Sequence, residues 1–274
     1  MKKRHLIIMS LAIMVFTACG DKKNTTDYRS TATETKSESI VPEKPELFEV
    51  NETHAMDNGN PKSPALTIEI SLPLAKGKNA DATKRMERAV TKAVYYDSYD
   101  SNNLKEATKF FVKEAKEQFY SMKEYYEEDN EAPFLNNSYE IKGTSGTGYG
   151  GYINYVIWNS SYTGGAHPMS TTTALCFDPE SGHEITINDL FKDEAMRELK
   201  NYIKEGIAKH FEVSTFQDVV DNGYLFDNSI HVSNNFILGI DKITFIYNPY
   251  EIAPYAAGEI IVEVPISKIK HLIK

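Results

Sequence analysis

The sequence predicts an α+β fold in which an antiparallel sheet has helices packed mainly on one face. In three stretches, apolar residues recur every three or four positions, which is the period of an amphipathic helix. Elsewhere, β-branched and aromatic residues gather in short runs with period-two alternation, which is typical of strands. Turns of two to eight residues join most of the runs between 139 and 187, and such short connections favour antiparallel pairing.

The first eighteen residues resemble a lipoprotein signal peptide. Three basic residues precede an apolar run from Leu6 to Phe16, which is too short to span a ~30 Å hydrocarbon core comfortably. Small residues stand directly before Cys19, so we expect Cys19 to carry an acyl chain such as palmitate and to anchor the mature chain in a membrane of the cell envelope. An ordinary secretory signal with a chance cysteine is the alternative.

The region after Cys19 is expected to be a flexible tether. Residues 21–45 are nearly free of apolar side chains, so they cannot bury enough surface to offset chain entropy. Leu47 to Val50 could dock as a short strand. The predicted division of the chain is a signal peptide over 1–18, the lipidated cysteine and tether over 19–64, an N-terminal α/β subdomain over 65–135 and a C-terminal α+β subdomain over 136–274.

The N-terminal subdomain is predicted to hold one strand and two helices. Leu66, Ile68 and Ile70 alternate with polar residues, and Pro73 ends that strand. Helices are expected over 80–96 and 103–128. The second helix has the clearer apolar stripe: Leu104, Ala107, Phe111, Ala115, Phe119, Met122 and Tyr126.

In the C-terminal subdomain the pattern changes to strands. Tyr152 and Trp158 are interpreted as packing within the sheet, because alternate aromatics on a strand usually lie in a core. A helix capped by Asp193 is expected, and Pro265 can open a terminal helix. The expected strands cover residues 139–145, 152–160, 170–177, 184–187, 236–238, 243–247 and 259–264.

Charge and cysteine content exclude some classes of function. The formal net charge is −9, and a chain this acidic is a poor candidate for binding nucleic acid. It could instead attract a basic protein by electrostatic steering. Cys176 lies in an apolar context and is expected to be a buried side chain without a disulfide partner.

The most distinctive local chemistry lies in the stretch from Tyr162 to Pro168, which reads YTGGAHP. Gly164 and Gly165 allow backbone angles that other residues avoid, Pro168 fixes the exit, and His167 anchors the turn. Tyrosines in loops supply large amphipathic contact areas. The predicted binding residues are therefore Tyr162, Gly164, Gly165, His167, Pro168, Tyr250 and Tyr255.

Three stretches together are similar to a known family: residues 162–168, residues 177–191 and the segment from Phe236 to Gly258. They resemble the extracytoplasmic domain shared by lysozyme-sensing anti-sigma factors and by the accessory region of certain peptidoglycan deacetylases. The resemblance implies an envelope domain that binds lysozyme-like proteins or peptidoglycan-derived sugar. Neither the sigma-binding segment nor the deacetylase catalytic domain has a counterpart in this sequence.

Two hypotheses of different class follow. The first, which the sequence favours, is a membrane-anchored binding module for a lysozyme-like protein or a cell-wall glycan, without cofactor. The second is a metal-dependent hydrolase of envelope components that uses His167 and His183 with the carboxylates of Asp178 and Glu184. No HExxH, paired CxxC, GxSxG or phosphate-loop motif is present. A structural envelope lipoprotein is a third possibility.

Overall fold

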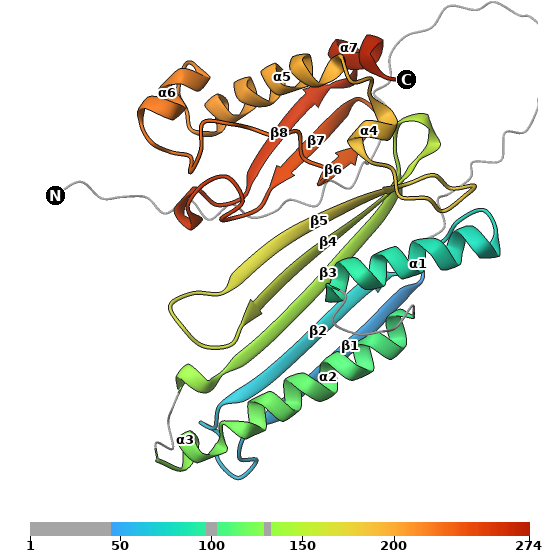
Figure 1. Cartoon of the computed structure of the whole chain (residues 1–274). Helices are drawn as coiled ribbons and strands as arrows, with labels where there is room; N and C mark the ends of the chain where they lie inside the picture. Colours follow the sequence, from blue (N-terminus) through green and yellow to red (C-terminus); the bar gives the residue numbers. More distant parts are fainter. Residues whose placement is uncertain (1–44, 97–102, 129–132) are drawn as a thin grey trace, which may run out of the picture. The chain divides into compact units, whose positions relative to one another are not determined.

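The computed structural model describes residues 45–96, 103–128 and 133–274. The predicted signal peptide, Cys19 and most of the predicted tether therefore lie outside the described residues. The described part contains a five-stranded sheet in the order β1-β2-β3-β4-β5 and a three-stranded sheet in the order β6-β7-β8 (Figure 1). This α+β architecture confirms the predicted fold class.

The five-stranded sheet is antiparallel except between its second and third strands. Those two strands run parallel because two helices intervene in the sequence, as a crossover connection requires. The strands are β1 (Leu47–Ala55), β2 (Ala65–Pro73), β3 (Asn137–Thr147), β4 (Ile153–Tyr162) and β5 (Met169–Phe177).

Helices α1 (Ala80–Tyr95) and α2 (Leu104–Ser121) cover one face of this sheet (Figure 1). Each begins at an asparagine whose side chain accepts a backbone hydrogen bond, from Ala82 to Asn79 and from Glu106 to Asn103. The apolar face of the helices packs on alternate residues of the strands. The core includes Leu66, Ile68, Ile70, Leu72, Met86, Val90, Phe119, Ile141 and Tyr155.

The three-stranded sheet has its own core. It consists of β6 (Phe236–Leu238), β7 (Lys242–Tyr247) and β8 (Ile260–Pro265), and α5 (Ala195–His210) packs on it. In the described ranges no helix has both the length and the apolarity that crossing a bilayer requires. The short helices are α3 (Lys123–Glu128), α4 (Ile187–Leu190), α6 (Phe216–Asp221) and α7 (Ile266–Ile269), with 3-10 turns at Pro133–Leu135, Tyr149–Gly151, Tyr255–Ala257 and Lys270–Leu272.

Two predicted boundaries are wrong. The tether does not extend to residue 64, because β1 pairs with β2 along its whole length, from Leu47 with Pro73 to Ala55 with Ala65. The division between residues 135 and 136 also fails, because β3, β4 and β5 complete the sheet that β1 and β2 begin and share its core.

Two predicted elements differ in detail. The strand expected over 184–187 is a single bridge between Phe177 and Glu184. Thr186 and Asp189 form a capping box instead, and it starts α4 at Ile187. The helix expected over 103–128 is two helices, α2 and α3, with Met122 between them.

Three asparagine side chains, which we call the asparagine joint, connect the two sheets. The Asn154 amide of β4 donates from Nδ2 to the Leu238 carbonyl at 2.9 Å and accepts from the Leu238 N–H at 2.8 Å. Asn235 donates to the Thr172 carbonyl at 2.8 Å and accepts from the Ala174 N–H at 2.7 Å. Each side-chain amide thus forms the pair of hydrogen bonds that the backbone of a neighbouring strand would otherwise form.

Asn248, the third member of the joint, forms hydrogen bonds to the same edge of β5. Asn248 accepts from the Thr172 N–H at 2.7 Å and donates to the Thr172 carbonyl at 3.0 Å. Gly148 allows the close approach beside Asn154, since a Cβ there would lie 1.8 Å from the Leu238 carbonyl oxygen. The two sheets are therefore held by specific polar contacts as well as by apolar packing.

We expect Asn154→Ala to destabilise the protein. Asn154 is 7% exposed, so its removal leaves the Leu238 N–H and carbonyl buried without partners. The free energy of unfolding should fall by about 2–4 kcal/mol in urea titrations. The exposed Asn228→Ala substitution is the control and should change it by less than about 0.5 kcal/mol. Equal effects of the two substitutions would contradict the role of the joint.

Candidate functional site

The YTGGAHP stretch is the connection between β4 and β5. Gly164 and Gly165 have φ angles of 94° and 100°, a region that favours glycine. The Tyr162 hydroxyl donates to the Gly165 carbonyl at 3.0 Å and closes the loop. Tyr162 and the two glycines therefore shape this connection, and the Tyr162 hydroxyl is engaged within it.

A second loop, between β7 and β8, carries the other two predicted tyrosines. Tyr250 has a left-handed backbone with φ of 69°, although it is not glycine, and its side chain is 51% exposed. Such conformations cost free energy and are found where surrounding structure imposes them. Here the Glu251 side chain accepts from the Asn248 N–H at 2.9 Å, and the Tyr250 N–H donates to the Ala253 carbonyl at 3.2 Å.

The two loops meet through aromatic and hydrogen-bonding contacts. The His167 ring stacks on the Tyr255 ring with a centroid distance of 3.9 Å and an interplanar angle of 17°. The Tyr255 hydroxyl donates to the Pro168 carbonyl at 3.0 Å, and His167 Nδ1 lies 3.0 Å from the same oxygen. Tyr250 adds a third ring, 5.6 Å from Tyr255. Residues 87 positions apart thus form one cluster.

Beside this cluster lies a small cleft, which we call the aromatic cleft. Its volume is about 230 Å³. It combines two aromatic rings with hydroxyl groups and a single carboxylate, that of Glu259, and no Lys or Arg lines it. The lining residues are Trp158, Ser170, Thr171, Thr172, Pro249, Tyr255, Gly258 and Glu259.

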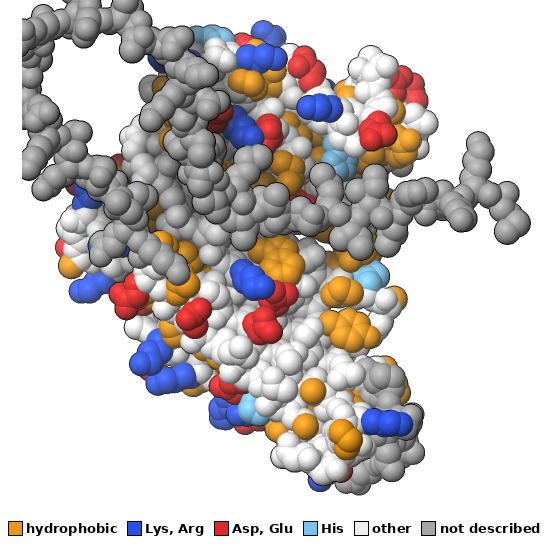
Figure 2. Space-filling view, turned by 180° about the vertical axis from the view of Figure 1, so that it is seen from behind, with side chains coloured by type: hydrophobic (Ala, Val, Ile, Leu, Met, Phe, Trp, Pro, Cys, Tyr) orange, Lys and Arg blue, Asp and Glu red, His pale blue; other side chains and the backbone are white. Residues whose placement is uncertain are grey.

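Part of the aromatic cleft lies on the open face of the five-stranded sheet, the face that α1 and α2 leave uncovered, because Trp158, Ser170 and Thr172 share this face. Trp158 sits on this face, paired with Lys142 of β3 and with Thr172 of β5. Lys142 is in turn ion-paired with Glu140. Figure 2, seen from behind, shows much of the surface there in white, the colour of uncharged polar side chains and backbone, with a few charged groups. This surface suits a ligand rich in hydroxyl and amide groups.

The interpretation of Trp158 as packing within the sheet is wrong. Its side chain is 37% exposed, whereas Tyr155 and Ile157 on the other face are buried. The sequence already indicated this exposure. Trp158, Asn154 and Ser160 are all even-numbered residues of β4, so they point to the same face of the strand, and the other two are polar. Glu259 was also missed, because a single acidic residue before an alternating strand gives no sequence signal. Tyr152, in contrast, does pack against a core.

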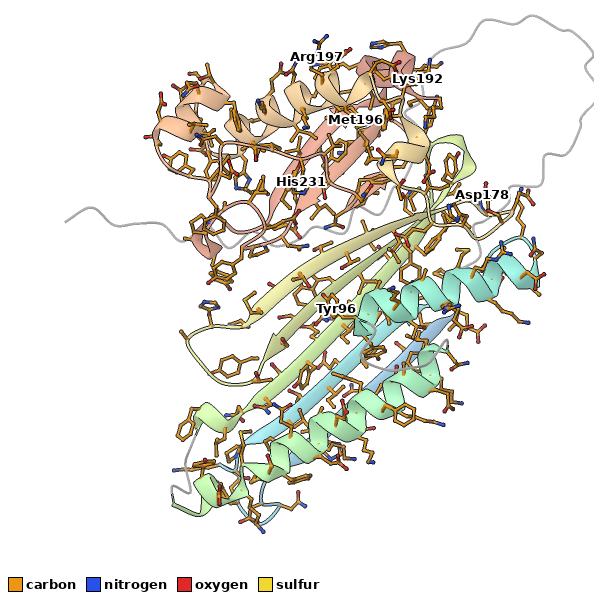
Figure 3. All side chains as sticks on the ribbon, in the orientation of Figure 1. Tyr96, Asp178, Lys192, Met196, Arg197 and His231 are labelled. Carbon is orange, nitrogen blue, oxygen red and sulfur yellow. The ribbon has the colours of Figure 1, made fainter. Side chains whose placement is uncertain are left out.

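The metal site hypothesised for the hydrolase is not formed. His167 precedes β5, while Asp178, His183 and Glu184 follow it, so the length of β5, about 26 Å, separates them. Figure 3 shows Asp178 at the far end of the strand from the β4–β5 loop. Across the described ranges, no three His, Cys, Asp or Glu side chains are grouped to hold a metal ion.

Residues 188–267 match the model of a family described as "Protein of unknown function (DUF3298)". The chain therefore contains a DUF3298-family domain. It spans α4 to the first residues of α7, including the three-stranded sheet, and it contributes Tyr255, Pro249 and Glu259 to the aromatic cleft. A search of the curated proteins finds no match.

Two solved structures show the same architecture beyond the matched domain. A member of the DUF3298 family from Bacteroides fragilis is 26% identical, with a TM-score of 0.67, over 84% of this chain and 93% of that one. A DUF3298-family protein from Pseudomonas aeruginosa is 13% identical, with a TM-score of 0.55, over 85% of this chain and 95% of that one. The five-stranded sheet is thus part of a fold shared with these proteins.

We expect the Cys176 thiol to be unreactive in the folded protein. It is 2% exposed, and burial, with a smaller contribution from Glu184, raises its pKa to about 12. In the Cys19→Ser chain it is the sole thiol. Its reaction with a disulfide reagent at pH 8 should be about a thousandfold slower than in denaturant. Similar rates in both conditions would show that the thiol is accessible.

Proposed function

We propose that this protein is a lipid-anchored binding module of the cell envelope whose aromatic cleft binds a glycan, such as a peptidoglycan-derived sugar. The proposal rests on one observation, the convergence of Trp158 and Tyr255 on a cleft with hydroxyl groups and one carboxylate. Its extension over the polar open face would accommodate further units of a polymer. The family resemblance described above favours the same class of ligand.

The chemistry of the aromatic cleft matches a sugar better than other small ligands. The C–H face of a pyranose packs on an aromatic ring, and its hydroxyls exchange hydrogen bonds with hydroxyl and carboxylate side chains. Phosphorylated ligands call for Lys or Arg, which the cleft lining lacks. The volume is below the roughly 300 Å³ at which drug-sized sites begin, so it suits a single ring of a longer chain.

Binding is supported over hydrolysis. Glycoside hydrolysis generally uses two carboxylates that flank the scissile bond, and Glu259 is the one carboxylate among the residues that line this cleft. A metal-assisted route would need a ligand cluster, which the described ranges lack. The residues present can hold and orient a sugar ring, and they offer no paired acid and base.

A basic, lysozyme-like protein is the second candidate ligand. The observation that favours it is the formal net charge of −9, which would steer a cationic partner toward the domain. This candidate needs no contact with the aromatic cleft. The two candidates therefore differ in whether Trp158 changes its environment on binding.

The glycan proposal predicts a change in tryptophan fluorescence. Trp158 is the sole tryptophan of the chain, so a ring that stacks on it should alter the emission of the Cys19→Ser protein directly. Titration with soluble peptidoglycan fragments should give a saturable change and raise the melting temperature. Trp158→Ala should weaken the rise in melting temperature, corresponding to a loss of about 1–3 kcal/mol of binding energy.

The exposed Tyr125→Ala substitution on α3 is the matched control, since it removes an aromatic ring far along the chain from the cleft. It should leave both the fluorescence change and the rise in melting temperature intact. Binding of lysozyme that leaves Trp158 emission unchanged and survives Trp158→Ala would favour the second candidate. No response to either ligand would remove both.

The anchoring part of the proposal predicts that Cys19 decides membrane association. The chain, expressed in a bacterial host with residues 1–18 intact, should incorporate labelled palmitate and partition into detergent. Cys19→Ser should abolish both, because the acyl chain supplies the membrane affinity. Cys176→Ser is the control and should incorporate label as the unmodified chain does. Incorporation that persists in Cys19→Ser would contradict the assignment.

A further inference from the structure

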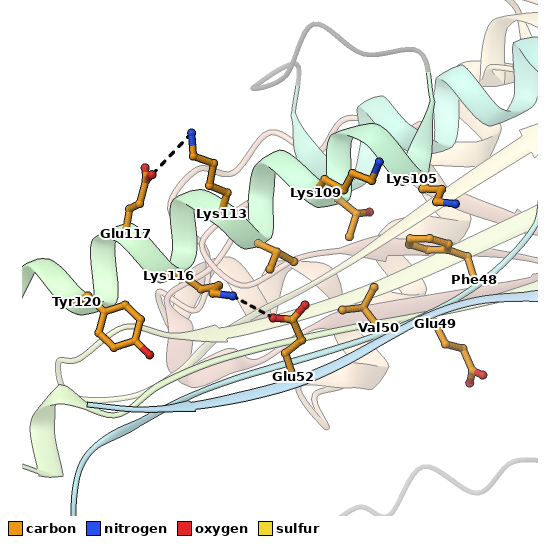
Figure 4. A pocket seen from close by; sticks show the side chains of 12 residues that line it. Phe48, Glu49, Val50, Glu52, Lys105, Lys109, Lys113, Lys116, Glu117 and Tyr120 are labelled. Atoms are coloured by element: carbon orange, nitrogen blue, oxygen red, sulfur yellow. Dashed lines mark ion pairs between the residues drawn. The ribbon is translucent and has the colours of Figure 1, made fainter. Parts of the chain in front are cut away.

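A larger groove lies on the opposite side of the five-stranded sheet from the aromatic cleft, between the outer edge of β1 and helix α2 (Figure 4). Its volume is about 850 Å³. We call it the lysine groove. β1 contributes Phe48, Val50 and Glu52, and α2 contributes Lys105, Lys109 and Lys113 among other residues.

The first relevant feature is the unpaired edge of β1. The Leu74 N–H donates to the Glu46 carbonyl, and the Met56 N–H donates to the Pro64 carbonyl. The backbone N–H and carbonyl groups of the even-numbered residues of β1 therefore point toward β2. The N–H and carbonyl groups of the odd-numbered residues between them point away from β2. The Ala55 carbonyl fits this pattern, since it accepts from the Tyr120 hydroxyl of α2 at 3.5 Å.

In the described part of the chain, no strand pairs with this outer edge, which runs about 20 Å from Leu47 to Thr53. The other edge of the sheet is covered. Asn235 and Asn248 bind the peptide groups of β5, and the Ile185 N–H donates to the Cys176 carbonyl at 2.7 Å. Proteins usually cover or charge such edges because they accept added strands. As far as the described residues go, the outer edge of β1 is therefore the edge of this sheet that remains available.

The second feature is the charge of the groove wall. Lys105, Lys109, Lys113 and Lys116 recur at spacings of four, four and three on α2, so they form one stripe along the groove. The groove is also lined by three glutamates, so it carries four lysines against three carboxylates, whereas the whole chain has a net charge of −9. The lysine stripe on α2 can pair with carboxylates of a partner.

Most of this positive charge is loosely engaged. Lys109 and Lys113 pair with Glu106 at 3.2 Å and Glu117 at 3.7 Å, in exposed pairs on the same helix that are weak in water. Within the described ranges, Lys105 has no carboxylate at ion-pair distance. Lys116 differs, because it lies 3.6 Å from Glu52, whose pKa is held below its usual range by the hydrogen bond from His54 and by Lys116.

The third feature is the apolar floor. Phe48, Val50 and Val112 are half-buried and face the groove between the strand and the helix. In a strand added beside β1, every second side chain would point to the face that α2 covers and would meet both this floor and the lysines. The remaining side chains would point to the open face of the sheet. A second copy of this chain fits poorly, because pairing two β1 edges around a twofold axis would bring two lysine stripes toward each other.

From these three features we propose that the outer edge of β1 accepts an extended segment of a partner protein in which every second side chain points into the groove, and that these groove-facing side chains include both acidic and apolar ones. The segment adds a sixth strand to the sheet. Its backbone bonds to the odd-numbered residues of β1, its apolar side chains cover Phe48 and Val50, and its carboxylates pair with Lys105, Lys109 and Lys113. This site is separate from the aromatic cleft.

The test uses the full-length Cys19→Ser chain and a labelled peptide of about ten residues. Every second residue of the peptide is in turn valine or glutamate, and the residues between them are threonine, so that one face of the strand carries both valine and glutamate. A peptide with lysine in place of glutamate is the control probe. Fluorescence anisotropy should show saturable binding of the acidic peptide and at least about tenfold weaker binding of the basic one. Amide exchange at Glu49, Asn51 and Thr53 should slow when the acidic peptide is bound.

Two variants separate the backbone and charge contributions. Asn51→Pro removes an outward N–H without touching the ladder to β2, and it should weaken binding by about tenfold or more. Asn51→Ala keeps the N–H and should bind within about threefold of the parent. Lys105→Glu with Lys109→Glu should also weaken binding about tenfold, while Lys200→Glu on the exposed side of α5 should not.

Three outcomes would overturn the proposal. One is no binding of the acidic peptide up to about 1 mM. Another is equal affinity for the basic peptide. The third is unchanged binding when both Asn51→Pro and the double lysine variant remain folded, as judged by their melting temperatures.

Discussion

The arrangement of the two sheets depends on the asparagine joint. The Asn248 side chain binds both the N–H and the carbonyl of Thr172. Thr172 of β5 is paired directly with Trp158 of β4. The width of the aromatic cleft is therefore set by hydrogen bonds of 2.7 to 3.0 Å rather than by apolar packing alone. Asn235 and Asn248 lie within the matched DUF3298 domain, whereas their partners on β5 lie before it. The domain and the preceding sheet thus contribute to one continuous surface.

Much of the fold could be predicted from local patterns, because helices and two-faced strands leave periodic signals. The glycines of the β4–β5 loop also act as expected, since their φ angles follow from the absence of a side chain. Only the start of β1 was predicted, as a short strand over Leu47 to Val50, because β1 has one half-buried face and an open edge, so only Phe48 and Val50 mark it as a strand. The joint could not be predicted, because an asparagine that connects two sheets has the same local sequence as one in a turn.

The position of Trp158 on the open face could have been predicted from the sequence, although it was interpreted as packing within the sheet. Aromatic residues on strands are usually core, yet parity placed this one with polar neighbours on the open face. The histidines show the converse error. His167 and His183 are close in sequence, but an intervening nine-residue strand carries them to opposite ends of the sheet. Two residues that flank a strand are therefore far apart in space even when they are close in sequence. Residues that lie opposite each other on paired strands point to the same face and can be in contact.

The asparagine joint also bears on how the protein ages. Asparagine converts to aspartate when the backbone nitrogen of the next residue attacks the side-chain amide. Pro249 follows Asn248 and has no N–H, so that route is closed there. Asn154 and Asn235 precede the bulky Tyr155 and Phe236, whose backbones are held in β4 and β6. An aspartate at any of the three positions would set a carboxylate oxygen against a backbone carbonyl. The sequence around the joint thus protects it from slow chemical damage.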